Sequence, residues 1–285
     1  MLHKEGHLTS GAQASIYYQY WTPEQTARAV ILVVHGAAEH SGRYQHLAEH
    51  FTAEGYAVAA LDQIGHGKSD GDCAHANRFE DHLVTLDNFL RQVQQDFADL
   101  PIVLFGHSMG GLIGSNYLLR NQSAFTTCIL SGPAIKTDLK PPAIQLLVIR
   151  FLSLILPKLG VLQLDANGVS RDPAEVERYR NDPLNYSGKM TARTVSEMFH
   201  SMHHIQANAQ NISLPILLLH GGDDPMTAPS GSQFLADNVS SQDKSLKIYP
   251  GLYHEIINEP EKDQVFADMD AWLNRFFPRG ALDQE

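Results

Sequence analysis

A serine between glycines is the feature of the chain best suited to chemistry. Gly106-His107-Ser108-Met109-Gly110 has the G-x-S-x-G pattern, and the apolar run Ile102-Val-Leu-Phe105 precedes it. A segment of helical period follows, so the serine is expected on a tight strand-to-helix turn. Such a turn exposes the hydroxyl and brings free helix N–H groups to the reacting centre. The pattern predicts Ser108 as a nucleophile, with an ordinary glycine-rich turn as the alternative.

A nucleophilic serine needs a base, and the base needs a carboxylate that orients it. Two later turns offer these groups: Asp223 and Asp224 in one, and His254 in the other. Each turn follows a predicted strand, at the sheet edge where open α/β sheets build their sites. Position rather than residue type selects His254 among 15 histidines. Asp223 and Asp224 stay open as alternatives, since either could serve only to cap a helix or turn.

Backbone N–H groups must also bind the negative charge that develops during acyl transfer. Met109, the residue after the serine, is expected to supply one of them. The loop His35-Gly36-Ala37-Ala38-Glu39-His40 follows an apolar strand, and Ala37 is expected to supply the other. The sequence has no recognisable phosphate-binding loop or metal-ligand cluster. We therefore expect neither a cofactor nor a metal.

These groups must be positioned by the surrounding elements. Apolar runs alternate with segments of helical period, which predicts an α/β fold with a mostly parallel, doubly wound sheet. The expected strands are 30–35, 57–61, 102–106, 126–131, 216–220 and 246–249, with 15–21 as an antiparallel edge strand. The expected helices are 43–54, 78–98, 110–120, 191–207, 230–238 and 261–277.

The alternation stops between about Pro133 and Ser213, where Ala143–Leu156 forms a 14-residue apolar run. We expect one α/β domain made of 1–132 and 213–285, with a helical cap inserted as 133–212. The apolar run is hydrophobic nearly all round, so it is either buried or in contact with lipid. Its helical spacing predicts that one face packs down and that Leu146 and Ile149 lie on a second apolar face. The residues expected to pack down are Ile144, Leu147, Val148, Phe151, Leu152 and Ile155.

Composition excludes several functions. The 285 residues are 43% hydrophobic, and 21 lysines and arginines stand against 32 acids, for a net charge of −11. That balance disfavours nucleic acid as a partner. Two cysteines do not make a disulfide framework. The chain begins without a signal-peptide pattern, and its apolar run is too short to span a bilayer. We expect a cytoplasmic protein, with peripheral membrane association as a further option.

Several segments together resemble the monoacylglycerol lipase and lysophospholipase branch of the α/β-hydrolases over nearly the whole chain. They are HGAAEHSGRY (35–44), LDQIGHGKSDG (61–71), GHSMGG (106–111), YRNDPL (179–184) and YPGLYHEIINEP (249–260). The resemblance implies the α/β-hydrolase fold with a cap. It implies Ser108 as nucleophile, His254 as base and Asp224 as acid, with Ala37 and Met109 as oxyanion donors. Two positions depart from the family: Ala38 replaces a glycine, and Ile257 replaces a polar residue near the headgroup.

The resemblance implies hydrolysis of single-chain lipid esters, above all of monoacylglycerol to glycerol and fatty acid through an acyl-enzyme. A lysophospholipase, a broad carboxylesterase, an aminopeptidase and a non-catalytic ligand-binding homologue are the alternatives. Glu39 and Arg43 are expected to hold the alcohol part, unless they form only a surface pair. Leu146 and Ile149 are expected to meet the acyl chain or a lipid surface. Transient contact with a membrane or micelle through the cap is expected, and an obligatory protein partner is not.

Overall fold

A mostly parallel sheet forms the centre of the molecule. The computed structural model describes residues 1–10, 14–137 and 143–279. Within them, eight strands form one sheet in the order β1-β2-β4-β3-β5-β6-β9-β10, in which β2 runs antiparallel to both of its neighbours and all other pairs are parallel. The bounds are β1 Leu2–Thr9, β2 Ser15–Thr22, β3 Val30–Val34, β4 Ala57–Leu61, β5 Ile102–His107, β6 Thr127–Ser131, β9 Ile216–Gly221 and β10 Lys244–Tyr249.

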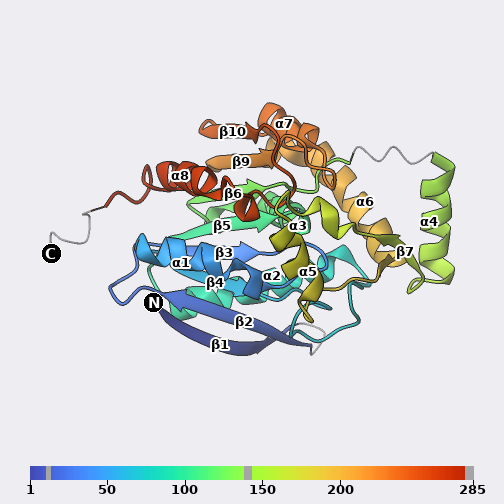
Figure 1. Ribbon diagram of the computed structural model, residues 1–285, viewed down its shortest axis with the longest axis horizontal. Helices are drawn as coiled ribbons and strands as arrows, with labels where there is room; N and C mark the ends of the chain where they lie inside the picture. Colours follow the sequence, from blue (N-terminus) through green and yellow to red (C-terminus); the bar gives the residue numbers. More distant parts are fainter. Residues whose placement is uncertain (11–13, 138–142, 280–285) are drawn as a thin grey trace.

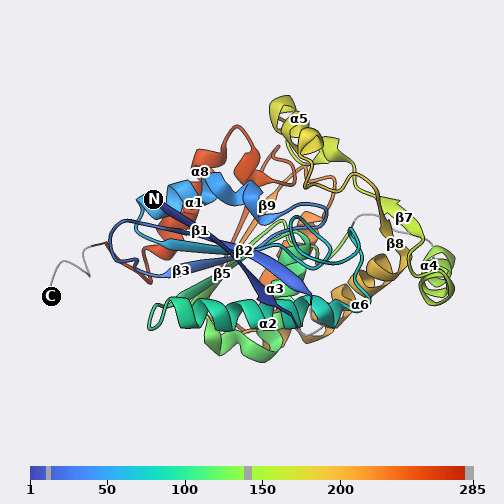
Figure 2. The same cartoon turned by 90° about the horizontal axis from the view of Figure 1, so that it is seen from below.

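Helices cover both faces of this sheet (Figures 1 and 2). One face carries α1 (Gln45–Ala53) and α8 (Lys262–Leu273), and the other carries α2 (Phe79–Asp96), α3 (Met109–Asn121), α6 (Ala192–Asn208) and α7 (Pro229–Asn238). The residues of β3 alternate between the two cores, since Val30, Leu32 and Val34 belong to one and Ile31 and Val33 to the other. Strands that are buried on both faces appear in the sequence as continuous apolar runs. The predicted doubly wound fold is confirmed.

The N-terminal strands differ from the prediction. Residues 15–21 were expected at the edge of the sheet, but β2 lies between β4 and a further strand, β1. The sequence of β1, LHKEGHLT, is polar and mostly exposed, as is usual for an edge strand. It therefore lacks the apolar run by which the inner strands are recognised.

The segment between β6 and β9 forms a separate layer beyond the carboxyl ends of the strands. It contains α4 (Ala143–Ile155), α5 (Pro173–Asn181) and a small antiparallel sheet of β7 (Gly160–Gln163) and β8 (Lys189–Thr191) that the sequence did not predict. Helix α6 leads from this layer back onto the face of the main sheet that carries α2 and α3. Figure 1 shows α4 at the outer edge of the molecule, next to α6 and β7. No helix in the described part of the chain is both long enough and apolar enough to cross a membrane.

The parallel strands bring distant loops together. β3, β5, β9 and β10 all end at the same edge of the sheet, and the loops that follow them start with His35, Ser108, Gly222 and Pro250. Because neighbouring parallel strands lie less than 5 Å apart, residues more than 100 positions apart in sequence meet at this edge.

Candidate active site

Ser108 lies at the sharp turn between β5 and α3. Its φ of 53° and ψ of −119° are unfavourable for a residue with a side chain, so the surrounding contacts must hold it there. Gly110 allows the turn, because a Cβ atom on it would collide with the carbonyl oxygen of Val34. Ser108 is half-buried, whereas its neighbours His107 and Met109 are buried. The serine thus has the strained and accessible position that the sequence pattern predicts.

Asp224 and His254 meet at the same sheet edge. The His254 Nδ1 atom lies 2.7 Å from Asp224 Oδ2, and both side chains are buried. Burial by itself would raise the pKa of Asp224, but the His254 charge and hydrogen bonds from His220 and His254 hold that pKa far below its usual range. Burial by itself would lower the pKa of His254, but Asp224 raises it above the ordinary value. The pair is thus arranged to stabilise a protonated imidazole.

The structure separates the two aspartates that the residues alone left open. Asp223 is exposed, and its backbone N–H donates to the Leu252 carbonyl. The second carboxylate oxygen of Asp224, Oδ1, accepts the backbone N–H groups of Met226 and Thr227 at 2.8 and 3.0 Å. These bonds fix the Asp224 carboxylate toward His254. Only Asp224 therefore occupies the place that an orienting acid requires.

The His254 ring also packs near the serine. Its centroid lies 4.7 Å from that of His107, the residue that precedes Ser108. A Cβ atom placed on Gly36 would lie 3.1 Å from the Ser108 Cβ atom, so the loop after β3 runs directly past the serine. The strand ends thus bring together the three segments on which the predicted site depends.

The loop that carries Ala37 is held at several points. His35 Nδ1 lies 2.7 Å from the Gly36 carbonyl oxygen, which belongs to the same peptide plane as the Ala37 N–H. The Ala38 carbonyl accepts from the Tyr186 backbone N–H at 3.0 Å and the Tyr179 hydroxyl at 3.1 Å. Met109 begins α3, so its N–H lies in the first turn, where no intrahelical acceptor exists. Both expected oxyanion donors thus stand in preorganised backbone, with Ala38 adopting a φ of 63°.

Glu39 and Arg43 form part of a buried network rather than a surface pair. Glu39 accepts from the Gly36 N–H at 2.5 Å, the Tyr44 hydroxyl at 2.8 Å and Arg43 Nη1 at 2.9 Å. Arg43 also binds both carboxylate oxygens of Glu255, at 2.6 and 2.7 Å. Both oxygens of Glu39 are thus already occupied, and a substrate hydroxyl would have to displace one of these donors to reach it.

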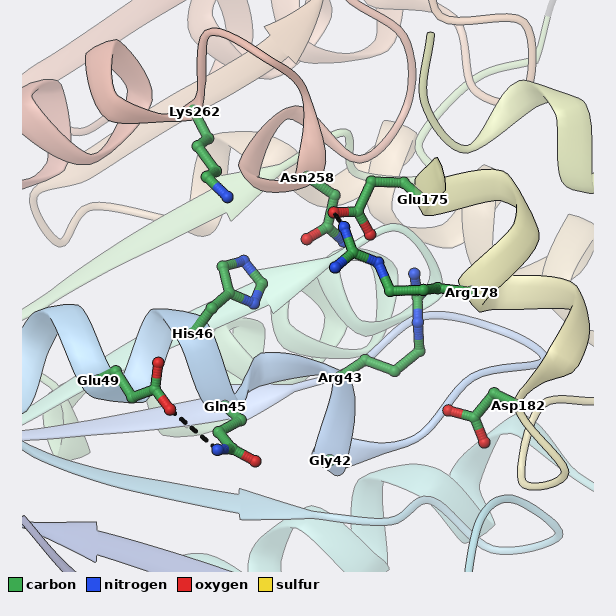
Figure 3. A pocket seen from close by; sticks show the side chains of 10 residues that line it. All are labelled: Gly42, Arg43, Gln45, His46, Glu49, Glu175, Arg178, Asp182, Asn258 and Lys262. Atoms are coloured by element: carbon green, nitrogen blue, oxygen red, sulfur yellow. Dashed lines mark hydrogen bonds and ion pairs between the residues drawn. The ribbon is translucent and has the colours of Figure 1, made fainter. Parts of the chain in front are cut away.

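One side of Arg43 faces a pocket of about 400 Å³ (Figure 3). Figure 3 shows that its walls come from the 3₁₀ helix η1 (Ser41–Tyr44) and α1, from α5, and from the 3₁₀ helix η5 (Ile256–Asn258) and α8. Arg178 of α5 lines the same pocket and pairs with Glu175. Polar and charged side chains thus line most of this pocket, and Ser108, Asp224 and His254 do not line it.

The orientation of α4 corrects the predicted packing. Ile144, Leu147, Val148, Phe151 and Ile155 were expected to pack down, but they are 48–66% exposed, and Leu152 alone of the expected set is half-buried. Ile149 packs instead, in a cluster that includes Ala37, Met190 and Val195. The side chain of Leu146 lies outside the described residues. Ile149 on the inward face and Ala37 thus pack against the same small cluster, and the outward face is apolar.

Sequence reasoning missed the residues that support the site. Glu255 directly follows His254, and Tyr179 opens the YRNDPL segment, so both stand inside recognised motifs without a role assigned to them. Thr227 was also missed, although it donates to Asp224 Oδ2 at 2.9 Å. Within the described part of the chain, no group of three or more His, Cys, Asp or Glu side chains is placed to hold a metal ion.

Comparisons with known proteins agree with this architecture. The family model described as serine aminopeptidase, S33 matches residues 25–261. A monoacylglycerol lipase of Mycolicibacterium smegmatis is 37% identical over 90% of this chain and 92% of its own length. The human monoglyceride lipase is 31% identical over 94% of this chain and 90% of its own. The crystal structure of the Paleococcus ferrophilus monoacylglycerol lipase matches 90% of this chain and 98% of its own with a TM-score of 0.82 and 31% identity.

The family model covers strands β3 to β10, the inserted segment and the loops of the site. The family model alone spans more than half of the chain, and the relatives align over nearly their full lengths. The chain therefore belongs to the monoacylglycerol lipase branch of the α/β-hydrolases, within the family described as serine aminopeptidase S33, and is a serine ester hydrolase.

Proposed function

We propose that this enzyme hydrolyses monoacylglycerol to glycerol and a fatty acid through an acyl-enzyme on Ser108. His254 takes the Ser108 proton as the hydroxyl oxygen attacks the ester carbonyl, and Asp224 stabilises the resulting imidazolium. The N–H groups of Ala37 and Met109 bind the oxyanion of the tetrahedral intermediate. His254 then gives its proton to the departing glycerol oxygen, and a water molecule attacks the acyl-enzyme by the same route in reverse.

The observation that carries this proposal is the 2.7 Å contact between His254 Nδ1 and Asp224 Oδ2 at the sheet edge of the strained Ser108. That contact leaves Nε2 as the ring nitrogen available to the serine. The relatives that bear the name monoacylglycerol lipase support the choice of substrate.

Ser108→Ala tests the proposal. Purified wild-type enzyme is expected to release fatty acid from micellar monoacylglycerol and to react with a fluorophosphonate probe. The variant is expected to lose about 10³-fold or more of this activity, to lose labelling and to keep its melting temperature, because the half-buried hydroxyl adds little packing. Lysophosphatidylcholine and an aminoacyl anilide serve as competing substrates. Hydrolysis by the variant at the wild-type rate would refute the nucleophile, and a preference for either competitor would refute the substrate.

We further infer that residues 133–212 act as a cap whose outer helix contacts the lipid aggregate. Support comes from α4, on which Leu147 and Phe151 are each 60% exposed and Leu154 is 67% exposed. A contiguous apolar face of this kind is unusual on a protein that meets only water. Arg150, which is exposed on the same helix, adds positive charge near this face in a chain of net charge −11. Burying each such side chain in lipid contributes at most about 1.5–3 kcal/mol, enough for reversible contact.

A further inference from the structure

Two loops of the site are joined by one buried cation. Arg43 forms ion pairs with Glu39, in the loop that carries Ala37, and with Glu255, the residue after His254. The three side chains are only 4–9% exposed. Within the described residues, Arg43 is the only cation paired with either carboxylate. The loop 35–40, which carries Ala37 (the oxyanion loop), and the loop 250–255, which carries His254 (the histidine loop), are therefore paired with the same guanidinium group although they lie more than 200 residues apart in sequence.

The geometry of the contact is rigid. Arg43 binds Glu255 through two parallel hydrogen bonds, the planar arrangement that fixes both orientation and distance. The guanidinium also lies over the Tyr179 ring, with its carbon 4.7 Å from the ring centroid. Tyr179 in turn donates to the Ala38 carbonyl. Arg43 thus reaches the oxyanion loop by two routes, through the Glu39 carboxylate and through the Tyr179 ring.

Two buried carboxylates near each other repel unless a cation lies between them. Burial by itself would raise the pKa of Glu255, but Arg43 lowers it to about 2, so Glu255 is ionised at neutral pH. Without Arg43, the loops that carry Glu39 and Glu255 would be pushed apart. Because Glu39 accepts from the Gly36 N–H, such a movement would turn the adjacent peptide that presents the Ala37 N–H.

We propose that Arg43 and Glu255 are positioning residues that hold the oxyanion loop and the His254 loop in the relative placement that the transition state requires. The proposal rests on the ester hydrolysis proposed above and assigns these residues a role other than contact with the alcohol part of the substrate. A displacement of about 1 Å in such groups lowers the rate by roughly 10²-fold. The loss falls on kcat, because an oxyanion forms only in the transition state.

Arg43→Ala tests the role directly, since Arg43 lines the pocket of about 400 Å³. The truncation leaves a void continuous with this pocket, through which a small planar cation can enter. We expect kcat to fall about 10²-fold with KM changed less than about threefold. Guanidinium at tens of millimolar is expected to restore kcat at least about tenfold. Urea, which is planar but neutral, and sodium chloride at equal ionic strength are expected to restore nothing.

Arg178→Ala is the matched control, because Arg178 lines the same pocket but pairs with Glu175. We expect it to keep wild-type kcat and to show no response to guanidinium. Glu255→Gln tests the other end of the contact with little change of shape. It keeps one hydrogen bond to Arg43 and loses the second, so kcat is expected to fall about tenfold. If Arg43→Ala does not fold, Glu255→Gln tests the proposal in its place.

The pH profile gives a readout that a purely structural role would not move. The charged or polar groups around His254 are Asp224 and Thr227 after β9, His107 of β5, Glu39 after β3, and Glu255. Removing Arg43 leaves Glu39 and Glu255 uncompensated, so the acid limb of kcat/KM is expected to move to higher pH. Glu255→Gln removes a negative charge and is expected to move it to lower pH.

The possible outcomes separate this proposal from the one on which it rests. A wild-type enzyme that fails to hydrolyse monoacylglycerol refutes the proposed function. If the wild type is active and Arg43→Ala and Glu255→Gln both keep the wild-type kcat, the positioning role is refuted. A folded Arg43→Ala protein with reduced kcat that guanidinium does not restore also refutes it. Acid limbs that shift in the same direction in both variants contradict the electrostatic link between the loops.

Discussion

At the scale of single residues, the site depends on a contrast between two adjacent aspartates. Asp223 is exposed, whereas Asp224 is buried and accepts hydrogen bonds from the His254 ring and from two backbone N–H groups. The NH2 group of an amide in place of the Asp224 carboxylate donates to Nδ1, so the proton of the neutral imidazole moves to Nε2. The Nε2 atom that faces Ser108 can then no longer accept the serine proton.

Asp224→Asn is therefore expected to lower kcat by about 10³–10⁴-fold, whereas Asp223→Asn changes it less than about twofold. The measurement is steady-state release of fatty acid from micellar monoacylglycerol by both variants. Circular dichroism must show that each is folded, because Asp224 also accepts the N–H groups of Met226 and Thr227. A larger loss in Asp223→Asn would reverse the assignment of the acid.

The residues alone predict Ser108 and His254, because each stands in a local motif after a predicted strand. They leave Asp223 and Asp224 open, and only the family resemblance selects Asp224. Glu255 could not be assigned from the sequence in the same way. Its partner Arg43 lies 212 positions away, and nothing in the sequence near either residue shows that the two loops meet. Long-range ion pairs of this kind are consequences of the sheet topology, which brings β3 and β10 loops to one edge.

At the scale of elements, α4 shows that hydrophobic periodicity does not always determine which face of a helix packs inward. The helix is apolar on nearly every side, so its sequence gives the length of the helix but not the face that turns inward. Ser153 is 2% exposed, while Leu154 beside it is 67% exposed. A small side chain on the inner face suits close packing, and α6 is the main neighbour of α4. The choice of face is thus made by fit to the neighbouring elements rather than by hydrophobicity.

The outward face of α4 predicts how the enzyme meets its substrate. Leu147→Ser combined with Phe151→Ser is expected to reduce flotation with phosphatidylcholine vesicles and activity on long-chain monoacylglycerol dispersions by about tenfold. Hydrolysis of a water-soluble butyrate ester and the melting temperature are expected to stay near wild type, because both side chains are 60% exposed.

Ile248→Ser provides the control for this experiment, since Ile248 is an exposed aliphatic residue on β10, at the opposite edge of the sheet from β1. It should leave vesicle binding and both activities intact. If the α4 variant instead lost activity on the soluble ester together with thermal stability, its two residues would support the fold and the lipid-contact role would be wrong.

At the scale of the whole molecule, two apolar cores on either side of the sheet hold the fold together. Most strands and helices of both cores were predicted within a few residues, because burial on both faces leaves continuous apolar runs in the sequence. The buried polar residues could not be predicted in this way. Fifteen histidines gave no indication of which would be buried, and several of them lie near the carboxyl ends of the strands.

Four of these histidines are buried in neutral form. Burial lowers the pKa of His35, His66 and His107 to about 4 and that of His82 to about 3, all from an ordinary value of 6.5. Below pH 6.5 the unfolded chain binds protons at these residues that the folded chain does not. The free energy of unfolding must therefore fall as pH drops from 6.5 toward 4.

Each buried neutral histidine contributes about 1.4 kcal/mol of lost stability per pH unit within this window. His254 acts in the opposite direction, because its raised pKa gives the folded chain the extra proton, and it offsets part of the loss. When the histidines with lowered pKa outnumber those with raised pKa by three to four, the loss of stability is enough to unfold an ordinary domain about two pH units below 6.5. The enzyme is thus expected to lose its fold in mild acid while its carboxylates are still ionised.

His82→Gln isolates one member of this set. His82 lies on α2, and its Nδ1 is 3.1 Å from the side-chain oxygen of Gln63, a contact that a glutamine amide can reproduce. Urea titrations of wild type and variant between pH 7 and 4.5 give the free energy of unfolding at each pH. The slope for the variant is expected to be smaller by about 1.4 kcal/mol per pH unit, so that the two stability curves converge or cross as the solution becomes acidic. An unchanged slope would mean that His82 takes up its proton within the folded protein, and the buried histidines could then not be the origin of acid unfolding.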